Sequence, residues 1–282
     1  MAAPAPAEPV TMQAPIPSSF LALIDADLAQ VGTLIQQRLN TDVALIAYAA
    51  QHIAHSPEQR VRPALALVCG RALGDSGARQ QVLAAAVELI HAALALHHEV
   101  DLPAEQAPAG LGNAPSVLLG DLLYTGAFRA IVELGDMRVL RVLADATNQV
   151  AEGSVMYQQT YQAADAPATA DESGRQHLRI TQARTASLFE AGARCAAILA
   201  AAPPEVEAAL AAYGQSWGLV WQLSRESHAE TPTPARPTQL SQTALSAALA
   251  QAQAALAQAR QGLSGLPESP YRQALLDANA LG

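Results

Sequence analysis

Residues 78–100 read ARQQVLAAAVELIHAALALHHEV and predict a long helix that is apolar on most of its sides. Such a helix has little surface suited to water, so we expect it to lie at the centre of the fold. Over the 282 residues, 51% of side chains are hydrophobic and only 4% are aromatic. Alanine and leucine dominate this apolar fraction and lose little entropy in a helix, which favours an all-α protein.

Helical spacing continues on both sides of this segment. Proline, glycine and the Asn-Thr-Asp run at 40–42 separate the patterns. The expected helices cover residues 20–39, 43–55, 62–74, 78–100, 113–134, 136–161, 171–202, 205–226, 240–262 and 271–280. We expect residues 1–19 to be a disordered tail and 20–282 one helical domain, with an irregular Pro-rich break at 231–239. No strand pattern competes, so the functional site is expected between helices of a bundle.

Charge and cysteine usage exclude several classes of protein. The net charge of −9 repels a phosphate backbone, which argues against nucleic-acid binding. Cys69 and Cys195 lie in apolar helical patterns, and we interpret both as small buried hydrophobes without a disulfide or zinc site. The amino terminus lacks a signal-peptide pattern, and we find no uninterrupted apolar run long enough to span a bilayer. We therefore expect a cytoplasmic protein.

Several short segments, each weak alone, occur in one order and spacing that resembles the trans-isoprenyl (polyprenyl) diphosphate synthases, and most closely the octaprenyl branch. The segments are RVRP at 60–63, VELIH at 87–91, GNAPSVLLGD at 112–121, AEG at 151–153, RTASLFEA at 184–191, YGQSWGL at 213–219 and LPESPYRQAL at 266–275. The resemblance implies an isoprenoid-synthase-type helical bundle with a central cavity between antiparallel helices. It also implies transfer of isopentenyl units to an allylic diphosphate.

The chain departs from this family where the chemistry needs acidic residues. Family members carry two D-D-x-x-D motifs whose carboxylates hold Mg²⁺ ions, which neutralise the departing diphosphate. Here the first motif position reads His98 and Glu99, with Asp101 one residue out of register. The second begins with Arg225 and Glu226. A guanidinium repels a cation and keeps its charge, so we expect both motifs to be lost and no metal to be bound.

Part of a diphosphate site nevertheless remains in the sequence. Arg60 and His91 match family positions that contact isopentenyl diphosphate, although Gln59 replaces a lysine beside them. The positions near the allylic diphosphate correspond to Arg184, Thr185 and Gln222. We hypothesise that Arg60, Arg184 and Arg225 hold an anion without magnesium, because the guanidinium fork suits phosphate oxygens. The alternative is that these arginines pair with Glu99, Glu152 or Glu226.

Other clusters have simpler interpretations. His97, His98, Glu99 and Asp101 resemble a transition-metal cluster, but we interpret them as a structural or solvated helix end. Four further histidines, among them His177, form no motif.

Two functions stay open at this point. The leading one is a non-catalytic homologue, a pseudoenzyme that binds an isoprenoid diphosphate or acts as a subunit. Its partner is then a second copy, in a homodimer, or an intact polyprenyl diphosphate synthase, in a heterodimer. The alternative is a weakly active or repurposed prenyltransferase that uses Mg²⁺ through Glu99, Asp101 and Glu226.

Overall fold

The computed structural model describes residues 21–55, 60–100, 112–161, 169–228 and 241–278. The described part is helical. Its helices are α2 (Asp25–Arg38), α3 (Ala44–His55), α4 (Val61–Ala72), α5 (Ala78–His98), α6 (Asn113–Leu134), α7 (Met137–Tyr161), α8 (Ala170–Thr181), the π-helical turn η2 (Gln182–Ala186), α9 (Ser187–Leu199), α10 (Pro204–His228), α11 (Gln242–Gln261), the 3₁₀ turn η3 (Gly262–Gly265) and α12 (Pro270–Asp277). The predicted helices are confirmed, with one exception near residue 182.

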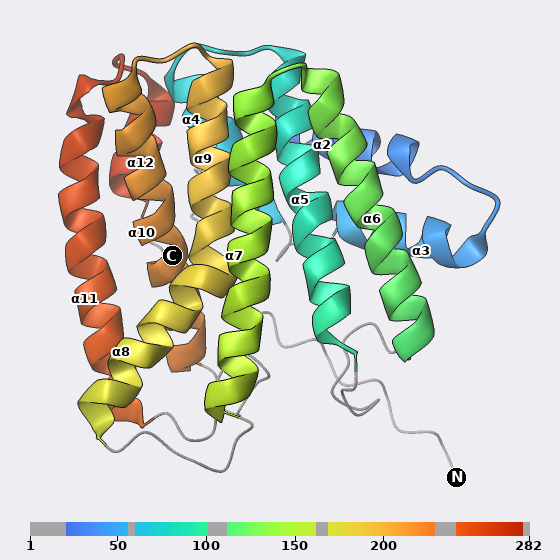
Figure 1. Ribbon diagram of the computed structural model, residues 1–282. Helices are drawn as coiled ribbons and strands as arrows, with labels where there is room; N and C mark the ends of the chain where they lie inside the picture. Colours follow the sequence, from blue (N-terminus) through green and yellow to red (C-terminus); the bar gives the residue numbers. More distant parts are fainter. Residues whose placement is uncertain (1–20, 56–59, 101–111, 162–168, 229–240, 279–282) are drawn as a thin grey trace, which may run out of the picture.

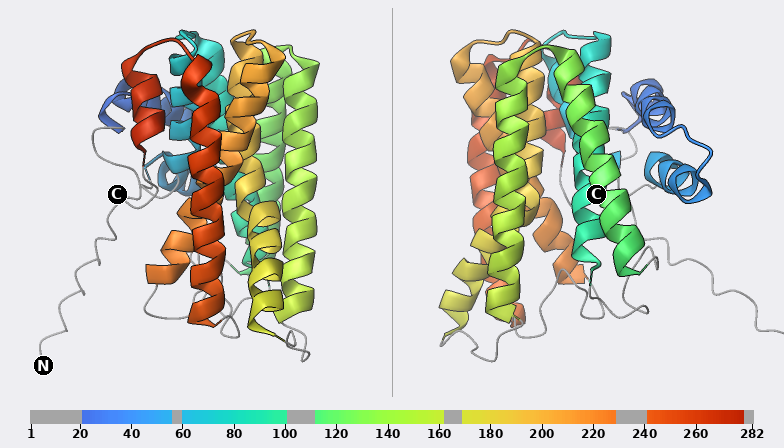
Figure 2. Two further views of the ribbon diagram at one scale, coloured as in Figure 1. Left: turned by 90° about the vertical axis from the view of Figure 1, so that its left-hand side faces the viewer. Right: turned by 45° about the vertical axis from the view of Figure 1, so that its right-hand side comes forward.

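The helices form a bundle whose long members run along one axis. Figure 1 shows α11, α10, α9, α7, α5 and α6 in this order from left to right, with α4 behind them. The pair α2 and α3 lies outside this bundle at its α5–α6 edge, and α2 packs on α5 (Figure 2). Helix α6 packs chiefly against α5, so much of its surface faces away from the bundle. This arrangement matches the expected all-α architecture.

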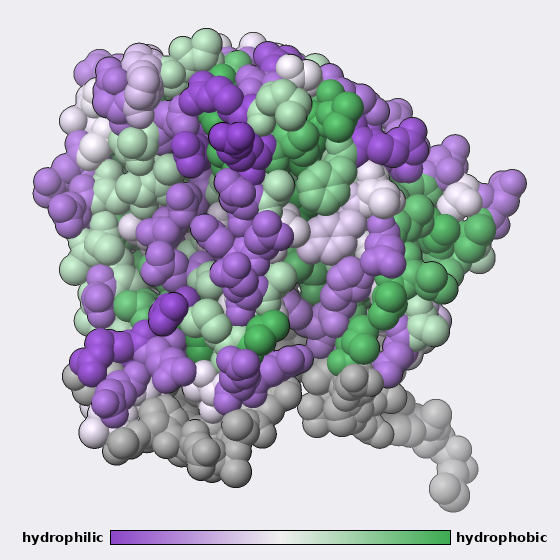
Figure 3. Space-filling view, in the orientation of Figure 1, coloured by the Kyte–Doolittle hydropathy of each residue, from purple (hydrophilic) through white to green (hydrophobic). Residues whose placement is uncertain are grey.

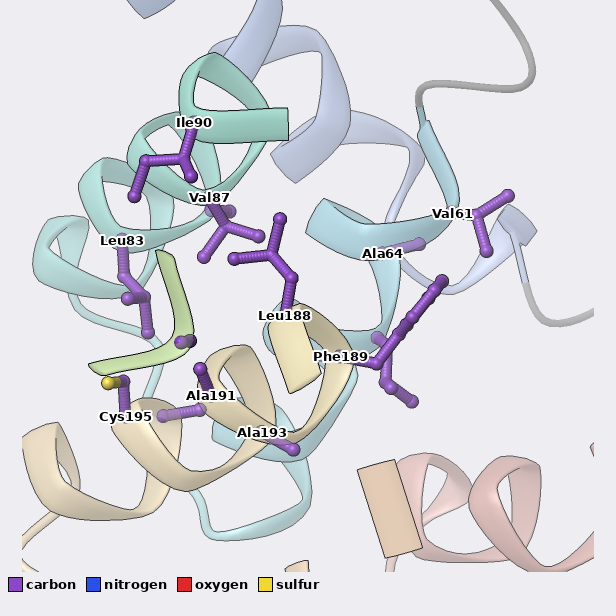
Figure 4. Close-up of a cluster of buried hydrophobic side chains, with 14 of the residues drawn as sticks. Val61, Ala64, Leu83, Val87, Ile90, Leu188, Phe189, Ala191, Ala193 and Cys195 are labelled. Atoms are coloured by element: carbon purple, nitrogen blue, oxygen red, sulfur yellow. The ribbon is translucent and has the colours of Figure 1, made fainter. Parts of the chain in front are cut away.

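Helix α5 lies in the core as its apolar sequence predicts. Its Leu83, Val87 and Ile90 are fully buried and face Leu188 and Ala191 of α9 in the interior (Figure 4). By length and composition alone α5 could cross a membrane, but 67% of the relevant window is buried inside the fold. Core burial removes the apolar surface of this helix from water and is therefore a sufficient reason for its composition.

Local signals set where several helices begin and end. The Thr169 hydroxyl accepts a hydrogen bond from the backbone N–H of Glu172, which caps α8. Ser241 caps α11 in the same way. Gly135 closes α6 in the left-handed region at φ 69°, a conformation that glycine adopts without steric cost. These caps satisfy backbone groups that the helix itself leaves without partners.

The expected single helix over 171–202 is wrong in one respect. Residues 182–186 form a π-helical turn between α8 and α9. A glycine on α7 makes room for this wider turn, because a Cβ atom at Gly153 would lie 2.7 Å from Cβ of Ala183 and 2.9 Å from the backbone nitrogen of Arg184. Interruptions of this kind occur frequently at functional sites, and this one carries Arg184.

The two cysteines behave as predicted. Cys69 and Cys195 are buried and free. Burial raises the pKa of the Cys69 thiol to about 12 and also raises that of Cys195. Both thiols therefore stay protonated and act as apolar core groups.

Candidate functional site

The candidate site lies where η2 meets α7 and α10. Its central cation is Arg184, whose guanidinium carbon lies 4.2 Å from the centre of the Tyr157 ring on α7. Burial lowers the pKa of Arg184, whereas Tyr157 and Glu226 act in the opposite direction. Arg184 also lowers the pKa of His98, so groups from α5, α7, η2 and α10 share one electrostatic environment.

His98, at the first acidic-motif position, is bonded to α7. Its Nε2 lies 2.5 Å from the hydroxyl oxygen of Ser154, and that hydroxyl donates to the backbone oxygen of Val150 at 2.7 Å. Burial, Arg184 and His97 together lower the pKa of His98 to about 4, so the ring is neutral near pH 7. The Ser154 hydroxyl gives its proton to the Val150 carbonyl, so the imidazole N–H of His98 donates to the Ser154 oxygen. Nε2 of His98 is therefore not available as a metal ligand.

Glu226, at the second acidic-motif position, is held by two other side chains. Its Oε2 lies 2.6 Å from Nε2 of His177 on α8, and its Oε1 accepts a 2.7 Å hydrogen bond from the Gln222 amide. The His177 and Glu226 side chains are only 1% and 3% exposed. Both carboxylate oxygens are thus bonded to protein groups in a buried place.

Arg225 and Arg62 both contact the indole ring of Trp221. The Arg225 guanidinium lies 4.7 Å from the Trp221 ring centre, and the buried Arg62 guanidinium lies 5.3 Å from it. Arg62 also lies 4.9 Å from the ring of Phe189 on α9. Cation–π contacts of this kind hold guanidinium groups in place inside a protein.

Glu88 and His91 on α5 are two further buried polar residues, and Arg62 influences the pKa of both. Burial raises the pKa of Glu88 to about 8, although Arg62 opposes the shift. Burial also lowers the pKa of His91 far below its ordinary value, with Arg62, His98 and Arg225 contributing. At pH 7 the Glu88 carboxyl is therefore mostly protonated and the His91 ring is neutral.

The structure brings together most, but not all, of the residues singled out from sequence. His98 and Arg225 contribute to the lowered pKa of His91, and Arg184 contributes to that of His98. Glu226 in turn acts to raise the pKa of Arg184, against the effect of burial. Thr185 follows Arg184 in the π-helical turn, Gln222 bonds to Glu226, and Glu99 follows α5 as its C-terminal cap residue. Arg60 lies at the amino end of α4, where its guanidinium is 3.4 Å from the Asp25 carboxylate of α2. Asp101 lies outside the described residues.

The residues of this site that the structure describes do not fit a magnesium centre. Within the described ranges, no group of three or more His, Cys, Asp or Glu side chains is arranged to hold a metal ion. Magnesium takes oxygen ligands in octahedral geometry, usually one or two carboxylates together with water and phosphate, whereas both oxygens of Glu226 are bonded to His177 and Gln222. Nε2 of His97, another candidate metal ligand, lies 3.3 Å from a carboxylate oxygen of Asp121 on α6.

Several residues of this site, among them Ser154, Tyr157 and His177, are not predicted from the sequence. His177 belongs to no motif, and its only local signal is an i, i+4 relation to Thr181. Arg62 and Glu88 lie in sequence segments that resemble the family, but those segments predict no role for them. Their burial, at 6% and 1% exposure, is the signal that the structure adds, because ionisable residues are almost never fully buried without a partner or a pKa shift.

Sequence comparisons relate the chain to one protein family. A profile described as "Polyprenyl synthetase" matches residues 43–224. The octaprenyl diphosphate synthase of Escherichia coli is 38% identical over 203 residues, which are 70% of this chain and 61% of that protein. The chain therefore spans about three fifths of the length of such curated relatives.

Solved structures extend the similarity across the bundle. The polyprenyl synthase of Caulobacter crescentus, complexed with calcium and isoprenyl diphosphate, has a TM-score of 0.77 and 29% identity over 93% of this chain and 97% of that one. A decaprenyl diphosphate synthase of Rhodobacter capsulatus has a TM-score of 0.76 and 28% identity, covering 92% and 96% of the two chains.

Proposed function

The chain belongs to the polyprenyl synthetase family, and from this premise we propose that it is a non-catalytic member that binds an isoprenoid diphosphate without magnesium and acts as a partner subunit. The observation that carries this proposal is the charge pattern at the candidate site. Arg184 and Arg225 supply permanent positive charge there, whereas Glu226 is hydrogen bonded to protein groups and His98 stands at an acidic position.

The electrostatics favour an anion over a cation. A diphosphate carries several negative charges, and arginine binds its oxygens through charge-assisted hydrogen bonds. Ionisation of an allylic diphosphate requires that the charge developing on the leaving group be neutralised, the role that metal ions take in such reactions. Because the described carboxylates do not form a metal site, binding without ionisation is the function that this arrangement supports best.

A subunit role needs an interface, and α6 offers one. On the side away from α5 it exposes Leu118 at 69% and Val132 at 64%, with Val117 and Leu122 more than a third exposed. Figure 3 shows apolar side chains over α6 and α3 on the right of that face. An apolar stripe on a peripheral helix is typical of a protein–protein contact. We propose that this stripe pairs with a second copy of the chain or with an intact polyprenyl diphosphate synthase.

Ligand binding is tested by calorimetry with pyrophosphate and with farnesyl thiodiphosphate, in EDTA and in Mg²⁺. We expect equal binding in both buffers. Arg184→Met should weaken binding roughly ten- to hundredfold, because it removes a charge-assisted contact. Arg141→Met is the matched control, since this exposed arginine lies on α7 outside the site. Binding that develops only with Mg²⁺ would refute the proposal.

The enzyme alternative is favoured by the 38% identity to a synthase and by Glu99 at the end of α5. Incubation with farnesyl diphosphate, labelled isopentenyl diphosphate and Mg²⁺ separates the two functions. We expect no chain elongation. Elongation at ordinary enzyme rates that disappears in Glu99→Ala would establish the prenyltransferase instead.

The interface is tested by light scattering after size exclusion and by co-expression with the host's intact synthase. We expect a dimer or a co-purifying complex that Leu118→Glu disrupts. Gln149→Glu, an equivalent charge change on the exposed face of α7, should leave assembly intact. A monomer that neither self-associates nor captures the synthase contradicts the subunit role.

A further inference from the structure

His177 is bonded to the carboxylate at the second acidic-motif position, although nothing in the sequence singles it out. We propose that His177 is the positioning residue that withdraws Glu226 from divalent-metal coordination and so makes the site selective for anions without metal. This inference rests on the proposed function and identifies the residue that determines its metal independence. Its role is to act through Glu226 and not to touch a ligand itself.

The contact has the geometry of a strong hydrogen bond. A separation of 2.6 Å between an imidazole nitrogen and a carboxylate oxygen requires a proton between the two atoms. The Thr181 hydroxyl lies 3.4 Å from the same nitrogen, one helical turn along α8. The second carboxylate oxygen accepts from Gln222, one turn back along α10. The Glu226 carboxylate thus lies between two i, i+4 pairs: His177 and Thr181 of α8, and Gln222 and Glu226 itself of α10.

Burial makes this arrangement hard to exchange for a metal ion. His177 and Glu226 are 1% and 3% exposed, so a hydrated cation reaching Glu226 must displace a protein donor and lose bound waters. Arg225, the preceding residue on α10, adds a permanent positive charge against the indole of Trp221. Two obstacles thus separate this site from metal binding: the charge of Arg225 and the hydrogen bond from His177.

The two obstacles predict a non-additive response to mutation. Arg225→Asp restores an acidic residue at the motif position but leaves Glu226 bonded to His177. It should therefore gain little affinity for Mn²⁺. Adding His177→Ala frees Oε2 of Glu226 and leaves space beside it, so the double variant should bind Mn²⁺ about tenfold or more tightly than Arg225→Asp alone. Adding His177→Gln instead keeps an N–H donor and should leave the affinity of the single variant unchanged.

Mn²⁺ affinity is measured by electron paramagnetic resonance of the free ion, with and without pyrophosphate. Circular dichroism melts establish that each variant is folded. Equal Mn²⁺ affinity in Arg225→Asp and in its His177→Ala double variant would overturn the inference. That result leaves the proposed function intact, because metal-free pyrophosphate binding by the unmodified chain is measured separately.

A measurement on the unmodified protein covers the case in which the double variant fails to fold. Mn²⁺ is titrated into protein carrying ¹⁵N-labelled histidine, in the presence of pyrophosphate. We expect the His177 imidazole signals to persist, because the nearby carboxylate does not take the ion. Selective bleaching of those signals means that Mn²⁺ binds at Glu226 and refutes the inference directly.

Discussion

Replacing Glu88 with glutamine tests whether this buried side chain forms a charged pair with Arg62 or is a neutral acid. Glu88 is 1% exposed, and both its carboxyl oxygens lack a hydrogen-bond partner among the described groups. Burial raises its pKa from 4.5 to about 8 against the opposing influence of Arg62. If the acid is protonated at pH 7, glutamine is nearly isosteric with it, and Glu88→Gln should leave the free energy of unfolding unchanged or higher.

The magnitude follows from the pKa difference. Above pH 4.5 the unfolded chain releases the Glu88 proton, whereas the folded protein holds it until about pH 8. Because the folded state binds more protons in this window, stability falls as pH rises. At about 1.36 kcal/mol for each unit, the loss between about pH 5 and about pH 8 is roughly 3 to 4 kcal/mol. Glu88→Gln removes this dependence.

The assay is urea unfolding of both proteins at several pH values, followed by circular dichroism. The difference in unfolding free energy should grow in favour of the variant from acid to alkaline pH. A charged Glu88–Arg62 pair predicts the reverse at pH 7, a destabilisation of about 3 to 5 kcal/mol, because the substitution would leave Arg62 buried without its counter-charge. That outcome, or parallel pH profiles, refutes the neutral-acid interpretation.

Three further substitutions test contacts that hold the bundle together. Gly214→Ala should destabilise the protein by about 1 to 3 kcal/mol in urea unfolding, because its Cβ would lie 2.7 Å from a carbonyl oxygen of α9. Tyr213→Phe should cost about 1 to 3 kcal/mol in the same assay, since the buried hydroxyl donates to the backbone oxygen of Leu275 at 2.6 Å. Asp27 is the third position. Burial acts to raise the pKa of its carboxyl, but the hydrogen bonds from Arg71 and Gln81 hold that pKa below 3.8. The stability this gives is present above pH 3.8 and disappears as pH falls, so Asp27→Asn should melt below the parent at pH 7 and converge with it near pH 3.

Much of the fold could be predicted because the spacing of apolar residues along the sequence indicates where helices form. The apolar run at 78–100 and the breaks around it placed α5 within two residues of its observed end at His98. The exception was the π-helical turn at Gln182–Ala186, which depends on Gly153 of a different helix. A pattern read along one helix carries no information about the neighbour that it will face.

The sequence by itself determined the bundle, the family and the residue types at the two motif positions, because these depend on local order along the chain. Only the tertiary structure decided what those residues do. It joined Glu226 to His177, placed Arg225 and Arg62 on one indole, and turned the Leu118 side of α6 outward. Each of these depends on which helices pack together, and helix packing places residues far apart in sequence within hydrogen-bond distance.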